Sequence, residues 1–151
     1  MNSPKHRLRK PPRSVSESSP SVSEKPVLCV DDNTAHLELH RAILERSGYT
    51  AITCSDCCQA MDVFRTTAVW LVVLDYSMPQ MNGAELARAM RMEKPNVPII
   101  MLSGQAEHPH DVGNAVDAYI VKGQNPRVLL HVIRSLITHQ SAANISQRAA
   151  G

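Results

Sequence analysis

The apolar run 71–74, which stops at the carboxylate of Asp75, constrains the fold of this chain more than any other stretch. Consecutive Leu and Val residues without polar alternation are typical of a strand buried on both faces, as in a parallel sheet. In open α/β sheets, ligands bind outside the carboxyl ends of the strands, so Asp75 is a candidate site residue. On this stretch alone, Asp75 could equally be a helix cap or a turn residue.

Four further runs have the length and composition of strands, and helical periodicity separates most of them. The strand candidates are 27–30, 50–54, 99–102 and 118–121. Helices are expected after Asn33 or Thr34, after Ser55 or Asp56, after Gly83 and after Asn125, whereas 105–117 supports at most a short or irregular helix. Strands that alternate with helices predict an α/β fold whose parallel sheet is covered on both faces.

The length of 151 residues suits one domain with its own core. We expect this domain at 26–139, between a disordered basic tail at 1–25 and a flexible C-terminal tail at 140–151, because both ends lack large apolar residues. Up to Lys25 the chain holds six Lys or Arg against two Glu, while its formal net charge is +2, so the domain itself is mildly acidic. This charge argues against nucleic acid binding.

No apolar run is long enough to span a membrane, so we expect a cytoplasmic protein without a membrane partner. Two other groupings have the chemistry of metal ligands: Cys54 with Cys57, and His36 with His40, which are one helical turn apart. Neither has further ligands close by in the sequence. We therefore expect structural thiols in a reducing compartment and ordinary surface or half-buried histidines.

Polar residues follow four of the five predicted strands: Asp31 and Asp32, Asp75, Ser103, and Lys122. Parallel strands place their carboxyl ends on one edge of the sheet, so these residues are expected to form one pocket. Three neighbouring carboxylates repel one another, and a divalent cation with oxygen ligands relieves this repulsion. Mg²⁺ is the expected ion.

Such a pocket suits phosphoryl transfer. An aspartate carboxylate can act as a nucleophile toward phosphorus, while a metal ion, an ammonium group and a hydroxyl neutralise the transferred oxygens. Lys122 can also pair with Asp75 before the reaction. The alternative is a set of unconnected loop residues and a salt bridge.

Four motifs make the chain resemble the receiver domain of two-component response regulators. They are Val30-Asp31-Asp32, the stretch 74–83 (LDYSMPQMNG), the stretch 98–104 (PIIMLSG) and Tyr119-Ile120-Val121-Lys122. The resemblance covers Pro26 to about Thr138. It implies the flavodoxin-like (βα)5 doubly wound sheet with strand order 2-1-3-4-5, as in the chemotaxis regulator of this family.

The resemblance also implies the role of each site residue. A sensor histidine kinase or a phosphotransfer protein would donate a phosphoryl group to Asp75. The implied ligands of Mg²⁺ are Asp31, Asp32, Asp75 and the backbone carbonyl of Ser77, while Ser103 and Lys122 would contact the phosphoryl oxygens. Ser103 and Tyr119 would form the switch that responds to the new charge, unless Tyr119 only fills space.

Three departures from the family pattern bear on the site. Gly123 follows Lys122 where the family usually has Pro, so a trans or rearranged turn is expected there. The interval from Ser103 to Lys122 is about three residues shorter than usual, which shortens the fourth helix. Trp70 stands where an acidic or polar residue is common, and we interpret it as packing or a contact surface.

We expect a stand-alone receiver that signals to an unidentified protein target, because the tails cannot hold an output domain. It would be a self-phosphorylating acceptor, which can lose its own phosphoryl group, and not a turnover enzyme. Alternatives are a phosphate sink in a phosphorelay, a degenerate interaction module that is not phosphorylated, and an aspartyl-phosphate hydrolase. Hydrolases of that kind usually have a second Asp where this chain has Ser77.

Overall fold

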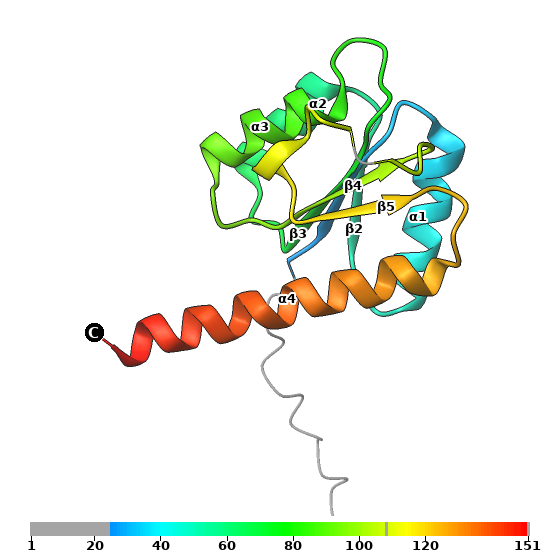
Figure 1. Cartoon of the computed structure of the whole chain (residues 1–151). Helices are drawn as coiled ribbons and strands as arrows, with labels where there is room; N and C mark the ends of the chain where they lie inside the picture. The colour runs from blue at the N-terminus through cyan, green and yellow to red at the C-terminus, as the bar shows by residue number, and fades with distance from the viewer. Residues whose placement is uncertain (1–24, 108, 151) are drawn as a thin grey trace, which may run out of the picture.

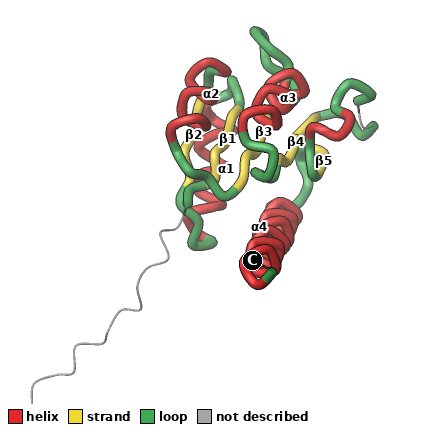
Figure 2. Tube along the Cα trace, turned by 90° about the vertical axis from the view of Figure 1, so that its left-hand side faces the viewer, coloured by secondary structure: helices red, strands yellow, loops and turns green. Residues whose placement is uncertain are grey.

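The computed structural model describes residues 25–107 and 109–150, so the predicted tail at 1–25 lies outside it except for Lys25. Five parallel strands form one sheet in the order β2-β1-β3-β4-β5, which confirms the predicted topology (Figures 1 and 2). The strands are β1 (Val27–Val30), β2 (Ala51–Cys54), β3 (Leu71–Asp75), β4 (Ile99–Ser103) and β5 (Ala118–Val121). The central strands β1, β3 and β4 are buried along their whole length, as their unbroken apolar runs predict.

The helices are α1 (Thr34–Arg46), α2 (Cys57–Thr66), α3 (Gly83–Glu93) and α4 (Pro126–Ala149), with one 3₁₀ turn, η1 (Gly113–Ala115). Each α-helix starts at a capping side chain that accepts backbone N–H groups of the first turn. The caps are Asn33, Asp56, Asn82 and Asn125. Because these caps end the loops that follow the carboxyl ends of strands, they help to fix the loops that carry the polar site residues.

Helices lie on both faces of the sheet (Figure 1), and an apolar cluster fills the space on each face. On one face, α2 and α3 pack through residues such as Phe64, Leu86 and Met90. On the other face, α1 and α4 pack through Leu44 and Ile133. The sheet is therefore shielded on both sides, and its carboxyl edge is the place where polar groups from several strands can meet.

The part of the connection between β4 and β5 that the structure describes holds only η1, in agreement with the prediction of a short or irregular fourth helix. Side chains of α3 hold this connection in place. The guanidinium of Arg91 donates to the carbonyl of Ala115 and pairs with Asp117 at 2.6 Å. Asp117 in turn accepts the backbone N–H of Ile99 at 2.8 Å. The shorter connection is thus tied to α3 and to the start of β4.

The structure continues α4 as far as Ala149, through most of the segment 140–151 that is predicted to be a flexible tail. Figure 1 shows this last part of α4 extending beyond the sheet. All side chains from 141 to 150 are exposed, so packing on the sheet does not explain the helix. The segment is rich in Ala and has no Gly or Pro before Gly151, which favours continuation of a helix that is already formed.

Among the residues that the structure describes, no helix is both long and apolar enough to cross a membrane.

Gly83 is required by close packing between the start of α3 and the end of β3. A Cβ atom at this position would lie 2.3 Å from the backbone oxygen of Asp75 and 2.9 Å from Sδ of Met101. We predict that Gly83→Ala lowers the free energy of unfolding by about 2 kcal/mol, because the backbone must shift to remove the overlap. Urea unfolding followed by circular dichroism measures this change.

Gly104→Ala is the matched control, because a Cβ atom at Gly104 would have no heavy atom within 4 Å. Equal stability losses for the two variants would contradict the packing explanation for Gly83.

Candidate functional site

Asp75 ends β3 at the carboxyl edge of the sheet, where its side chain is 3 % exposed. Backbone hydrogen bonds fix the chain directly after it: Tyr76 N–H donates to Leu102 O at 2.8 Å, and Gly83 N–H donates to Tyr76 O at 2.8 Å. The backbone next to the Asp75 carboxylate is therefore held by hydrogen bonds to β4 and to the start of α3. This placement confirms Asp75 as a strand-end residue, not a helix cap.

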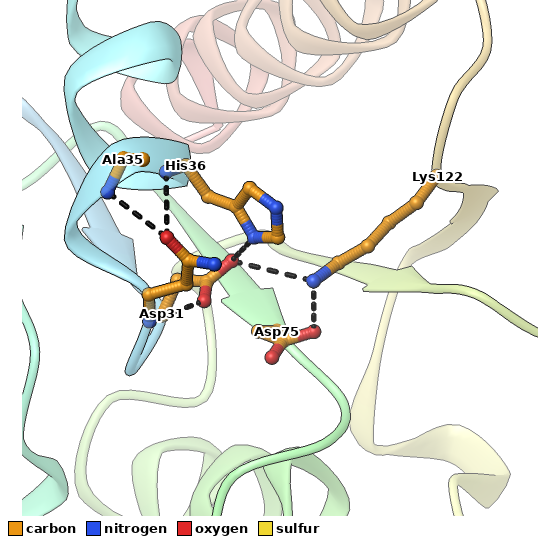
Figure 3. Close-up of polar contacts among 6 residues, drawn as sticks. Asp31, Ala35, His36, Asp75 and Lys122 are labelled. Atoms are coloured by element: carbon orange, nitrogen blue, oxygen red, sulfur yellow. Dashed lines mark hydrogen bonds and ion pairs between the residues drawn. The ribbon is translucent and has the colours of Figure 1, made fainter.

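Lys122 lies at the end of β5 and reaches back across the edge of the sheet (Figure 3). Its Nζ atom is 2.7 Å from Oδ1 of Asp75 and 3.4 Å from Oδ2 of Asp31. The Lys122 backbone N–H donates to Ser103 O at 2.7 Å, which fixes the start of the side chain beside β4. One ammonium group thus pairs with two buried carboxylates from different strands.

Asp31 follows β1 and is 2 % exposed. Its Oδ1 accepts the backbone N–H of Asn33 at 2.9 Å, and its Oδ2 lies 3.1 Å from Nδ1 of His36 (Figure 3). The interpretation of His36 as an ordinary histidine missed this contact. The signal in the sequence was its place on the first turn of α1, five residues after Asp31.

Three carboxylates form a candidate site for a divalent cation. Oxygen atoms of Asp31, Asp32 and Asp75 all lie within 4.8 Å of one another. Asp31 and Asp75 are buried whereas Asp32 is exposed, so the cluster opens to solvent on the Asp32 side. The donor set consists of hard oxygen ligands, and one ammonium group does not balance three negative charges, so the cluster fits a divalent cation.

Ser77, the fourth implied metal ligand, lies in the exposed loop after β3. Its backbone N–H is hydrogen-bonded to the Asp75 carboxylate, an interaction that lowers the pKa of Asp75. The metal-binding role of the Ser77 carbonyl stays a prediction.

The two partners of the central ion pair both have raised pKa values. Burial raises the pKa of Asp75 and the charge of Asp31 adds to this, although the hydrogen bond from Lys122 opposes it. Burial lowers the pKa of Lys122, but the hydrogen bond and charge of Asp75, together with Asp31, outweigh burial and raise it overall. Lys122 is therefore a cation at neutral pH, and the carboxylate of Asp75 is a better proton acceptor than a free aspartate.

The two predicted switch residues both contact the start of the β4–β5 connection. Ser103 is 1 % exposed, and its Oγ accepts the backbone N–H of Gln105 at 3.1 Å. The ring of Tyr119 packs against the core on the α2–α3 side, and its hydroxyl donates to Gln105 O at 2.9 Å and to Glu107 O at 3.2 Å. Tyr119 therefore packs and also binds this connection, while the switching role of both residues stays a prediction.

Two of the three departures from the family pattern, Gly123 and Trp70, leave the contact between Lys122 and Asp75 in place. Gly123 has φ +85°, a left-handed conformation that glycine adopts without strain, and none of the described residues has a cis peptide bond, as expected for this turn. Trp70 packs against the α1–α4 side of the core, and Nζ of Lys25 lies 4.9 Å from the centre of its ring. Trp70 precedes β3, so it lies at the opposite end of that strand from Asp75.

The cysteines take no part in the pocket. All four are free, and Cys29, Cys54 and Cys57 are buried as expected for structural thiols, whereas Cys58 is exposed. Burial raises the pKa of Cys29 to about 12, which keeps this thiol protonated and unreactive.

Comparison with known proteins shows the class of protein that has this fold and this site. The family model described as "Response regulator receiver domain" matches residues 27–134. The chain belongs to this family, the phosphoacceptor domains of two-component signalling. Receiver domains of response regulators interact with histidine kinases.

Curated relatives include the alkaline phosphatase synthesis transcriptional regulatory protein PhoP of Bacillus subtilis, which is 32% identical over 122 residues. The match covers 79% of this chain and 51% of that protein. The phosphate regulon transcriptional regulatory protein PhoB of Pseudomonas aeruginosa is 30% identical over 118 residues, with 75% of this chain and 52% of that protein covered. The chain therefore spans about half the length of these curated relatives.

Two solved structures with the same fold are matched over nearly their whole length. A CheY-like receiver domain protein of Methanospirillum hungatei has a TM-score of 0.76 and 32% identity, with 80% of this chain and 99% of that chain covered. The response regulator TrrA of Thermotoga maritima, solved in complex with Mg²⁺ and BeF, has a TM-score of 0.70 and 32% identity, with 74% and 98% covered.

The raised pKa of Asp75 leads to a prediction about stability. Because the folded-state pKa lies above the unfolded value, the charged carboxylate costs stability at neutral pH, and this cost disappears as the pH falls below the unfolded value of about 4. We predict that Asp75→Asn raises the free energy of unfolding at pH 7 by about 1 kcal/mol, which is the typical size of the stability change that a single substitution causes. This gain in stability should vanish near pH 4.

Urea unfolding in the presence of EDTA at both pH values measures this gain. A variant that is less stable than the wild type at pH 7 would contradict the conclusion that burial and the charge of Asp31 make the Asp75 carboxylate unfavourable.

Proposed function

We propose that Asp75 accepts a phosphoryl group from the phosphohistidine of a sensor histidine kinase or a phosphotransfer protein. The observation that carries this proposal is the contact of 2.7 Å between Lys122 Nζ and Asp75 Oδ1 beside a cluster of three carboxylates. This arrangement joins a buried nucleophile, a fixed cation and a set of oxygen ligands in one pocket. Membership of the receiver family supports the same role.

Each residue of the pocket has a distinct role in the proposed transfer. An Asp75 oxygen attacks phosphorus, the P–N bond to the donor imidazole breaks, and a P–O bond to the carboxylate forms. Lys122 neutralises a phosphoryl oxygen, and the hydroxyl of Ser103 donates to another. When bound by Asp31, Asp32, Asp75 and the Ser77 carbonyl, Mg²⁺ supplies the remaining positive charge.

A cavity beside the pocket suits the approach of a donor protein. It has a volume of about 310 Å³ and lies between α1 and the start of α4, with Leu39, His40, Lys122 and Leu129 in its lining. Leu39 is 56 % exposed although it is apolar. An apolar groove that ends at Lys122 fits a side chain from a partner helix, which would bring the donor histidine close to Asp75.

The proposed protein is an acceptor that is modified once per transfer and can lose its own phosphoryl group, and not a turnover enzyme on an external substrate. We propose that it acts in the cytoplasm and signals through contacts with another protein, with no role for nucleic acid or membrane. Lys122 contacts Asp75 despite the glycine at 123, which counts against a degenerate module. No specific observation favours a phosphate sink or an aspartyl-phosphate hydrolase.

The proposal predicts one phosphorylation site. With acetyl phosphate and Mg²⁺, the wild-type protein is expected to gain a single phosphoryl adduct that hydroxylamine removes, because acyl phosphates react with this nucleophile. Asp75→Asn is expected to gain none, and Asp62→Asn, which changes an exposed aspartate on α2, should be modified like the wild type. Intact mass spectrometry measures the adduct, and an undiminished adduct in Asp75→Asn would contradict the proposal.

The metal site gives a second test. Asp32 is the exposed member of the carboxylate cluster, so its removal should leave the buried ion pair intact. We predict that Asp32→Asn weakens Mg²⁺ binding by about tenfold, because one charged oxygen ligand is lost. Isothermal titration calorimetry measures the affinity, with Asp62→Asn again as the control. Unchanged Mg²⁺ affinity in Asp32→Asn would exclude this carboxylate as a ligand.

A further inference from the structure

A group of side chains outside the phosphoryl pocket ties the segment after Asp75 to the β4–β5 connection. The hydroxyl of Tyr76 donates to the carboxylate of Asp111, at 3.1 Å from Oδ1 and 3.3 Å from Oδ2. The side-chain amide of Asn82 donates to Oδ2 at 3.3 Å, and the guanidinium of Arg88 donates to the Asp111 carbonyl. We call Tyr76, Asn82, Arg88 and Asp111 the Asp111 clamp.

The clamp lies where the backbone itself provides little regular structure. Among the described residues of the β4–β5 connection, η1 is the only regular element, and this turn begins two residues after Asp111. Residues 104–107 and Asp111 are exposed, so burial does not fix them. Hydrogen bonds from α3, from the loop before it and from Tyr119 on β5 therefore contribute to the position of this part of the connection, together with the buried side chain of Val112.

The clamp meets the site at two points. Tyr76 directly follows the proposed phosphoacceptor, Asp75, and the connection that Asp111 belongs to begins directly after Ser103. The Ser103 hydroxyl oxygen accepts the N–H of Gln105, whose carbonyl accepts the hydroxyl of Tyr119. A displacement of the connection would thus be transmitted to the Ser103 side chain.

Asp111 accepts two side-chain donors from the loop that leads into α3, the hydroxyl of Tyr76 and the amide of Asn82. A carboxylate that accepts two donors makes stronger hydrogen bonds than a neutral acceptor.

We propose that Asp111 is a positioning residue for phosphoryl binding: through Tyr76 and Asn82 it holds the β4–β5 connection, and with it the Ser103 hydroxyl, beside Asp75. This inference rests on the proposed function, since the position of Ser103 matters only when Asp75 carries a phosphoryl group. None of the hydrogen bonds described for the clamp involves Asp31 or Asp32. It should therefore affect the binding of a phosphoryl group and leave the binding of the metal ion unchanged.

The test uses the full chain and two probes: Mg²⁺ alone, and beryllofluoride at saturating Mg²⁺ as the phosphoryl mimic. Tyr76→Phe and Asp111→Ala are each expected to weaken beryllofluoride binding by about fivefold, as expected for the loss of one hydrogen bond to a charged group. Mg²⁺ affinity should stay within about twofold of the wild type in both. Isothermal titration calorimetry measures both affinities.

The double variant and a conservative variant separate positioning from general damage. The double variant Tyr76→Phe with Asp111→Ala should lose no more beryllofluoride affinity than the single variant with the larger loss. Both changes remove the same hydrogen bond, the one from the Tyr76 hydroxyl to Asp111. Asp111→Asn should lose less than Asp111→Ala, since an amide oxygen can still accept from Tyr76. The matched controls are Tyr49→Phe and Glu93→Ala. Tyr49 lies between α1 and β2 and packs against the α1–α4 side of the core. Glu93 pairs with Arg65 in an exposed salt bridge between α2 and α3.

The inference would be overturned if both single variants bound beryllofluoride within about twofold of the wild-type affinity, or if either bound it more tightly. It would also be overturned if the loss of Mg²⁺ affinity equalled the loss of beryllofluoride affinity. An additive loss in the double variant would overturn it as well, because it would show two independent effects. Failure of the wild-type protein to bind beryllofluoride with Mg²⁺ would instead contradict the proposed function, so the two claims fail separately.

Discussion

The structure of the site depends on an imbalance of charge at the carboxyl edge of the sheet. Three carboxylates lie within 4.8 Å of one another, and Lys122 is the cation that pairs with two of them. Burial raises the pKa of Asp75, and the nearby charge of Asp31 raises it further. Binding of further positive charge would stabilise the three carboxylates, and the proposed transfer of a phosphoryl group to Asp75 requires that charge. Under the proposed function, stability and function are therefore opposed at Asp75, as is common at sites that bind charged ligands.

The rest of the fold serves to hold this unfavourable group of charges in place. Strands β1, β3 and β4 are buried on both faces, so their ends cannot move independently of the core. Gly83 lets α3 begin close to the backbone of Asp75, and the caps at the starts of the helices fix the loops between. Precision at the site thus comes from apolar packing several residues away from it.

The sequence predicts the parts of this account that depend on local patterns. Unbroken apolar runs and capping residues indicate the strands and helices, and the polar residue at each strand end indicates the pocket. The strand order came from the family resemblance, since local patterns do not fix it. The contact of His36 with Asp31 has a local signal, the spacing of five residues across the start of α1. The contacts of Asp111 could not be predicted, because they join segments that come together only in the folded chain. The helical segment after Gln140 was missed because exposed, Ala-rich sequence carries no apolar stripe.

The central claim is that one pocket combines a metal site with a reactive aspartate. A crystal structure of the protein with Mg²⁺ and beryllofluoride tests it most directly. We expect beryllium bonded to an Asp75 oxygen, Mg²⁺ bound by carboxylate oxygens of Asp31, Asp32 and Asp75, and the Lys122 ammonium moved from Asp75 to a fluorine atom. Beryllofluoride bonded elsewhere, or Mg²⁺ bound without Asp31 and Asp32, would contradict the claim.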